Sequence, residues 1–327
     1  MSGLTAIHSS AEQTAIPSVE QLPSQVGYAP GLGYSLAVLS VLCNAVAIHI
    51  FRRVLDVVPP YTLMPLNVAV GIPAFLLLAV LWRRRGWRAA NLERLTPASM
   101  LRAMHTGGWQ MALSFTIGGV GGLLYLVSLK HFGPDLSSFL GNGTVVILVL
   151  AGLYGRERLS ALELATIAAI VVGAFTFSWR GGNLAWGALG LMALSCCGTA
   201  VKHLSVKYFS MDYGIGTMVA VNMTFMGLTG LVSGLVAGAH MLPPIGMMGL
   251  IVVGTLIGPV LGMTMLYGSY TLIGVSRGAP IDAMRPLAVL VISIVLGMAD
   301  LGPLQLLGGL AMLIGSALLA SQGTRKR

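Results

Sequence analysis

The residues best suited to chemistry are ionisable side chains that fall inside long apolar stretches. Asp282 and Arg285 are three residues apart and stand immediately before Pro286, so they share one side of a helix and can pair with each other. The planar guanidinium of arginine fits carboxylates and phosphates. The pair therefore indicates a gate or a site for an anionic group, although both side chains could instead reach the membrane surface and pair there.

A second group of candidates follows one stripe of a predicted helix. Ser195, Thr199 and Lys202 have the i, i+4, i+7 spacing that places side chains on one face, and His203 adjoins them. Thr199 and Lys202 are therefore predicted to face a common site. Lys202 stands a few residues before the end of its apolar stretch, so the alternative is that its side chain lies at the membrane surface. We expect His203 and His49 to be interior or interfacial histidines rather than proton relays.

Uncharged polar residues at membrane depth complete the candidate site. An asparagine in hydrocarbon needs a partner, which is either a neighbouring helix or a ligand in a wet cavity. A tyrosine combines an apolar ring with a hydroxyl group that seeks a hydrogen bond. The predicted substrate-binding residues are Asn44, Asn67, Tyr125, Asn142, Thr199, Lys202, Asn222, Tyr267, Asp282 and Arg285.

The same inventory argues against catalysis and against a bound cofactor. Asp282 is the one acidic residue that falls clearly inside a predicted span, whereas a membrane enzyme needs a constellation of such groups. Cys43, Cys196 and Cys197 lack the spacing of a metal site, and there is no phosphate-binding Walker loop. We expect a protein that is not an enzyme, with no catalytic residue, no metal and no cofactor.

These side chains must be positioned by membrane-spanning helices. Of the 327 residues, 56% are hydrophobic and only 9% are charged, against roughly 25% charged in soluble domains. Apolar stretches of about 20 residues cross a hydrocarbon core, and their continuous rather than alternating pattern excludes an outer-membrane barrel. The sequence predicts ten spans, near residues 32–54, 61–82, 106–129, 135–155, 160–179, 184–207, 214–238, 245–274, 280–298 and 303–322.

The positive charges orient these ten spans. With the strongly basic loop after the second span placed in the cytosol, the inner side holds fourteen Lys and Arg residues and the outer side four. This bias follows the positive-inside rule, so the net charge of +9 does not indicate a nucleic-acid partner. Residues 1–31 are predicted to be a disordered cytosolic tail, and 323–327 a basic cytosolic tail.

The two halves of the chain, 32–180 and 181–322, align with each other. At an offset of 155, LSVLCNAV (39–46) meets LSCCGTAV (194–201) and Asn67 meets Asn222. At an offset of 142, Tyr125 meets Tyr267, and the register continues to the end of the fifth span. Five spans per half is an odd number, so the second half would be inverted, as in many secondary transporters. Chance alignment of Leu-, Val- and Gly-rich helices is the alternative.

The segment 123–175 resembles the closing half of an EamA-type repeat of the drug/metabolite transporter superfamily. The resemblance rests on a Glu-Arg-Leu-Ser turn, Glu157–Ser160, placed before a last helix that contains glycine. The second half departs from this pattern, because it reads MADLGPLQ, with Asp300 displaced by one position and no arginine. The resemblance implies a ten-helix inner-membrane carrier, in a family whose bacterial members mostly export amino acids, other metabolites or drugs.

We therefore expect an all-α polytopic protein of the bacterial inner membrane, with both termini cytoplasmic, that works as a secondary transporter. Its partners would be a small-molecule substrate and the lipid bilayer. Lys202 and Arg285, with His49, outnumber Asp282, which favours anionic or zwitterionic metabolites as cargo. A lipid or lipid-linked flippase of the same fold is the alternative, and a membrane-embedded enzyme is a third hypothesis.

Overall fold

The protein is built of helices joined by short connections. The computed structural model describes residues 30–84, 95–144, 147, 161–177, 179–180, 183–184, 186–239, 242–273, 281–282, 284–298 and 302–322. The elements are α1 (Pro30–Leu55), α2 (Pro60–Arg84), α3 (Pro97–Thr106), α4 (Gly108–Gly141), α6 (Ala161–Phe177), β1 (Trp179–Arg180), β2 (Asn183–Leu184), α7 (Trp186–Tyr213), α8 (Ile215–Val236), α9 (Ile245–Thr255), η2 (Leu256–Gly262), α10 (Met263–Ile273), α12 (Arg285–Val295) and α13 (Pro303–Gln322). The two strands form a two-residue antiparallel pair between α6 and α7.

Within the described part of the chain, six helical segments are long and apolar enough to cross a membrane. They are Gly31–Leu55, Pro60–Leu81, Gly108–Gly141, Trp186–Val206, Gly216–Val236 and Ile245–Leu266. Two shorter apolar helices, Arg285–Val295 and Pro303–Gly315, accompany them. A helix satisfies its backbone hydrogen bonds internally, which hydrocarbon requires of any spanning segment. The chain is therefore a multi-pass, all-helical membrane protein, as expected from its composition.

Two of the long helical segments are broken. The apolar pattern predicts the first break, between the spans 106–129 and 135–155, and it lies inside α4 at Gly133, where φ is +85° and Pro134 follows. The chain reverses direction there, because the hydroxyl oxygens of Ser128 and Ser137 lie 3.0 Å apart. The predicted span 245–274 is divided into α9, the π-helix η2 and α10, with Pro259 inside η2. Both breaks have the usual cause, since proline cannot donate an intrahelical hydrogen bond. Residues 148–160, with the Glu157–Ser160 turn, lie outside the described residues.

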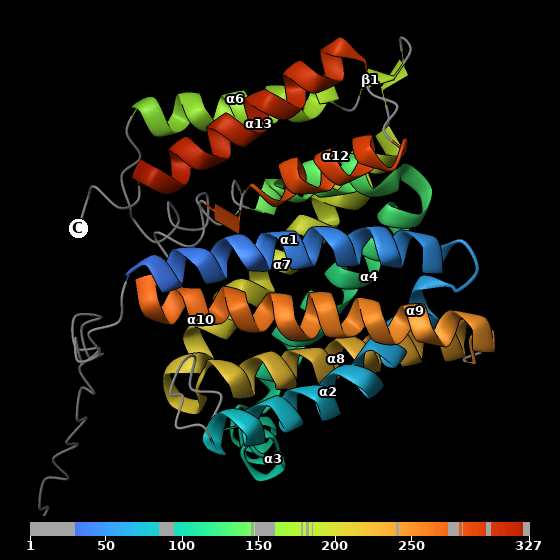
Figure 1. Ribbon diagram of the computed structural model, residues 1–327, viewed down its shortest axis with the longest axis vertical. Coiled ribbons are helices and arrows are strands. Elements are labelled where there is room, and N and C mark those ends of the chain that lie inside the picture. The colour runs from blue at the N-terminus through green and yellow to red at the C-terminus, as the bar shows by residue number, and fades with distance from the viewer. Residues whose placement is uncertain are drawn as a thin grey trace, which may run out of the picture.

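The helices form a bundle of roughly parallel and antiparallel rods (Figure 1). α6 and α13 lie side by side along one edge, and α12 lies between this pair and α1. α1 packs along α9, η2 and α10, while α2 packs on α8 and α4 on α7. The beginning of α1 and the end of α13 lie on the same side of the bundle in this view.

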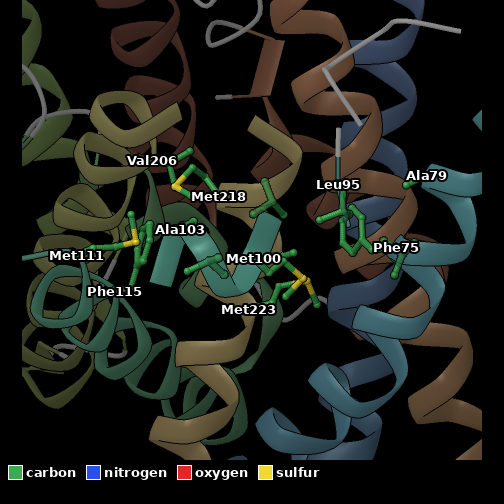
Figure 2. Close-up of a cluster of buried hydrophobic side chains, with 14 residues drawn as sticks. Phe75, Ala79, Leu95, Met100, Ala103, Met111, Phe115, Val206, Met218 and Met223 are labelled. Atoms are coloured by element: carbon green, nitrogen blue, oxygen red, sulfur yellow. The ribbon is translucent and has the colours of Figure 1, made fainter. Parts of the chain in front are cut away.

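The largest buried cluster ties the short helix α3 to the longer ones (Figure 2). Thr96 and Ser99 form a capping box at the start of α3, with Pro97 in its first turn. This arrangement fixes the start of the helix. Met100 and Ala103 of α3 then enter a core made by α2, α4, α7 and α8, so α3 is anchored to these helices.

Two glycines allow a close backbone approach between α4 and α7. A Cβ atom added at Gly198 would lie 2.7 Å from the carbonyl oxygen of Ile117 and 2.8 Å from the Cα of Gly121. Ser195, one turn earlier on α7, donates a 2.8 Å hydrogen bond to the carbonyl oxygen of Gly121. Small residues at such contacts let two backbones approach in a membrane, so no larger side chain fits here.

Two other helix pairs make contacts of the same kind. Ser40 of α1 donates a 2.8 Å hydrogen bond to the carbonyl oxygen of Gly262 in η2. At the bundle edge, a Cβ at Gly173 of α6 would lie 2.7 Å from the carbonyl oxygen of Gly308, and a Cβ at Gly315 of α13 would lie 3.4 Å from that of Thr166. Glycine and serine thus mark the lines along which these helices touch.

We predict that Gly198→Ala destabilises the protein, whereas Gly190→Ala on the same helix does not. Both changes favour the helix by about 1 kcal/mol, but only the first adds a methyl group against backbone atoms, and nothing lies within 4 Å of a Cβ at Gly190. Overpacking costs about 1–3 kcal/mol. Thermal unfolding of the two variants in detergent measures the difference, and equal stability would contradict the packing described for α4 and α7.

Candidate substrate-binding site

Arg285 begins α12, and its guanidinium is paired with the carboxylate of Asp282. The Nη2 atom of Arg285 donates to both oxygens of Asp282. The side chains are 29% and 22% exposed, respectively, so the pair is half-buried. Pro286 in the first turn starts the helix at this point. The sequence-predicted i, i+3 pair is therefore formed.

Lys202 of α7 lies within electrostatic range of both members of this pair. The base of its side chain packs on α4, because a Cβ at Gly118 would lie 2.8 Å from the Cβ of Lys202. His203 interacts with Lys202 and Arg285 in turn. We call Lys202, His203, Asp282 and Arg285 the cationic cluster; in it the positive groups outnumber the one carboxylate.

Tyr125 of α4 extends the cationic cluster. Its hydroxyl group hydrogen-bonds with Ser138, beyond the bend in the same helix, and interacts electrostatically with Arg285. Thr199 is half-buried on α7, one turn before His203. Residues from α4, α7 and α12 thus meet at one place, although they are far apart in sequence.

Two of the predicted asparagines make contacts between or within helices. The amide nitrogen of Asn44 donates to the carbonyl and hydroxyl oxygens of Ser40, at 2.9 and 3.2 Å. The hydroxyl of Thr255 on α9 lies 2.7 Å from Oδ1 of Asn67 on α2. Both asparagines thus serve helix packing in this structure, which is the alternative that the sequence left open for them.

Asn222 of α8 is in a different situation. It is 8% exposed, its amide nitrogen lies 3.6 Å from the sulfur of Met226, and its Oδ1 has no hydrogen-bond partner among the described residues. A buried carbonyl oxygen without a donor costs about 1–3 kcal/mol.

Asn142 is buried at the end of α4. Tyr267 belongs to α10, but its side chain lies outside the described residues.

Asp135 is a second buried acidic residue that the sequence analysis did not single out. It lies in α4, two residues after the break at Gly133, and is 8% exposed. Its carboxylate accepts a 2.6 Å hydrogen bond from the hydroxyl of Ser293 on α12. The sequence places Asp135 at a predicted span boundary after Gly133 and Pro134, where such residues usually mark a loop. The FGPD sequence was the available signal, since Pro and Asp favour a first helical turn.

His49 of α1 is interior, as expected, and adjoins this carboxylate. It is 6% exposed, and its Nε2 atom lies 3.1 Å from the carbonyl oxygen of Val289 and 3.5 Å from the hydroxyl of Ser293. Nδ1 has no hydrogen-bond partner in the part of the chain that the structure describes. Because a carbonyl oxygen only accepts, Nε2 carries the proton and Nδ1 is left as an acceptor. We call His49, Ser293 and Asp135 the polar chain.

A hollow of about 420 Å³ lies elsewhere, where the turn between α1 and α2 meets the end of α8 and the connection to α9. Tyr61 and Thr62 supply its polar side chains, and its remaining lining consists of small or apolar residues. Without a charged group in its lining, this hollow does not supply the charge complementarity of the cationic cluster.

Comparisons with known proteins give the fold but not the family. A scan against models of known protein families gives no match, and neither does a search of curated proteins. One solved structure, described only as "Crystal structure of protein", aligns with a TM-score of 0.58 and 17% sequence identity, over 91% of this chain and 98% of that one. Nearly the whole chain thus adopts an architecture already seen in an experimental structure.

We predict that Asn222→Leu leaves the protein as stable as the wild type or more so, whereas Asn44→Leu destabilises it. Both asparagines are 8% exposed. Leucine at 222 removes an oxygen that lacks a donor, whereas leucine at 44 removes two hydrogen bonds and puts a branched side chain against Gly262. Thermal unfolding in detergent checks both. A large loss of stability at 222 would show that Asn222 serves the fold and not a ligand.

Proposed function

We propose that the protein is a secondary transporter that moves a small anionic or zwitterionic metabolite by alternating access. The observation that carries the proposal is a set of helix contacts that recur between the halves of the chain. Transporters of this kind consist of two similar halves around a binding site near the membrane midplane. In such a protein, a contact between helices of one half recurs between the corresponding helices when the two halves are exchanged.

The contact between α6 and α13 is reciprocal. Adding the sequence offset of 142 to each residue that α6 contributes gives the corresponding residue that α13 contributes. Gly173 of α6 approaches the carbonyl oxygen of Gly308, and Gly315 of α13 approaches that of Thr166. Gly173 corresponds to Gly315 and Thr166 to Gly308 at this offset. The same offset relates the two side chains that contact these glycines, Ile170 and Met312. A two-fold axis between the helices produces this reciprocity.

A second recurrence relates α1 and η2 to α7 and α4. Ser40 donates to the carbonyl oxygen of Gly262, and Ser195 donates to that of Gly121, both at 2.8 Å. The serines are 155 residues apart, which is the offset expected for the first spans of the halves. The two glycines are 141 residues apart, one fewer than the offset of 142 at which the halves align from Tyr125 and Tyr267 onward. The π-helix η2 lies at this point and absorbs an added residue.

These recurrences support an inverted pair of five-helix units. In Figure 1, α1 begins and α13 ends on the same side, as an even number of crossings requires. α1 and the connected α9, η2 and α10 run in opposite directions along each other. Ten crossings, an EamA-like fold, cytoplasmic termini and the bacterial inner membrane complete the proposal, together with export as the direction of transport.

The cationic cluster is the proposed binding site. A charged group at membrane depth costs at least about 2.5 kcal/mol, so such groups indicate function. Arg285 and Lys202 together exceed the charge of Asp282, and a carboxylate or phosphate of the solute would balance them. The open acceptor of Asn222 offers a place for an ammonium or hydroxyl group, which is the reason for including zwitterions.

The test is flux into liposomes that contain the purified full-length protein. Radiolabelled amino acids and phosphorylated metabolites are added one at a time, without nucleotide, after thermal stabilisation of the protein has ranked them. We expect saturable uptake of at least one solute. Failure of every solute to move, with rapid transfer of labelled phospholipid between the leaflets, would overturn the proposal in favour of a flippase.

We predict that Arg285→Glu and Lys202→Gln abolish this uptake, because each removes a positive group from the cationic cluster. Arg53→Glu is the matched control, since Arg53 is exposed at the end of α1. Thermal unfolding verifies that each variant is folded, and Lys202→Gln keeps the test valid if the carboxylate introduced by Arg285→Glu repels Asp282 too strongly for folding. Unchanged uptake in both folded variants would rule out the cationic cluster as the binding site.

A further inference from the structure

We propose that Asp135 is a proton-binding carboxylate that couples proton movement to transport. Ser293 and His49 would form the route by which the proton reaches this carboxylate. The inference rests on the proposed transport function and adds its driving ion. Three observations carry it: a carboxylate that is buried in the first turn after the break in α4, a hydroxyl bridge to another helix, and a buried imidazole nitrogen with no partner among the described residues.

The polar chain joins three helices at one level of the bundle. Asp135 comes from α4, His49 from α1 and Ser293 from α12, and all three residues are at most 8% exposed. α1 and α4 belong to the first half of the chain and α12 to the second. The bond between Asp135 and Ser293 therefore ties the two halves together, and a change in its strength alters how readily they move apart.

Protonation changes that strength in a definite way. While Asp135 is ionised, it accepts the Ser293 hydroxyl proton in a charge-assisted bond, which is about twice as strong as a neutral one. When a proton binds to Asp135, the charge is lost and the bond between the halves becomes an ordinary one. A proton thus favours the conformation in which α4 and α12 are separated, and such a differential interaction is what coupling requires.

The imidazole of His49 supplies a route for the proton. A proton bound at Nδ1 allows Nε2 to release its own proton to the Ser293 oxygen, and Ser293 passes its original proton to Asp135. The sum is one proton gained by Asp135, while His49 changes from the Nε2–H to the Nδ1–H tautomer. The 3.5 Å step between His49 and Ser293 is the longest in the polar chain, so a small approach of α1 to α12 is needed for this transfer.

Other titratable groups surround the polar chain, and most of those on the neighbouring helices are engaged. On α1, Arg52 pairs with Asp56; on α12, Arg285 is paired with Asp282; and on α7, the thiol of Cys196 donates to Leu140. α4 itself carries Lys130, which is half-buried, and His131, which is exposed. Asp135 is more buried than either Asp56 or Asp282, which makes it the choice for a proton carrier within the membrane.

Infrared difference spectroscopy tests the titration without any knowledge of the solute. Spectra of the purified full-length protein at acidic and neutral pH are subtracted, and we expect the C=O band of a buried, protonated carboxyl group. Asp135→Asn should remove this band, and Ser293→Ala should shift it, because one hydrogen bond is lost. The matched control Asp56→Asn should retain it, since Asp56 is exposed. A band that persists in Asp135→Asn, or no band in the wild type, would overturn the proposal.

Proton flux tests the coupling. Liposomes containing the protein and the pH dye pyranine are mixed with an amino-acid solution, and internal pH and amino-acid uptake are recorded together. We expect proton movement with uptake in the wild type and in Asp56→Asn, and uptake without proton movement in Asp135→Asn. Uptake without proton movement in the wild type would refute coupling while leaving transport intact. An infrared band without any uptake would refute transport, and coupling with it.

Discussion

The close approach of α4 and α7 at Gly121 and Gly198 is the constraint on which the rest of the structure depends. Lipid offers no hydrophobic force that drives helices together, so packing and hydrogen bonds must hold them. The glycines supply the packing and Ser195 supplies the hydrogen bond. Lys202 follows Ser195 by two turns on the same face, so this contact also determines where the lysine meets α4. A structural interaction thereby positions a charge of the candidate site.

Positions that correspond in the proposed duplication share their packing but not their functional groups. Ala47 of α1 corresponds to Lys202 of α7 at the offset of 155. Each of these residues packs against a glycine. A Cβ atom added at Gly258 would lie 2.5 Å from the Cβ of Ala47, and one added at Gly118 would lie 2.8 Å from the Cβ of Lys202. The two positions therefore pack alike, but only one carries an ammonium group. Function resides in the residues added to a common frame, so a site between two similar halves need not itself be symmetric.

The sequence predicted where the helices lie and which of their faces are buried better than it predicted which helices pack against each other. The long apolar stretches predicted the helices, and the i, i+4, i+7 stripe correctly put Ser195 and Lys202 on the face of α7 that meets α4. Helix periodicity identifies a face but not the helix that covers it. The pairing of His49 with Ser293, and of Tyr125 with Ser138, depends on tertiary packing and on the bend at Gly133. Asp135 was not singled out because Gly133 and Pro134 mark the boundary of a span, and the sequence does not show that Ser293 of α12 covers the carboxylate.

The short helix α12 connects the two polar regions of the protein. Arg285 stands at its first residue and Ser293 eight residues later, a separation of about 12 Å at 1.5 Å per residue. Pro286, Val289, Leu290 and Ser293 form its buried face, and the carbonyl oxygen of Val289 is held by His49. If α12 moves as one rod, a displacement caused by the proposed anion binding near Arg285 would also change the bond between Ser293 and Asp135. This shared element would give the proposed proton binding and the proposed solute binding a direct mechanical relation.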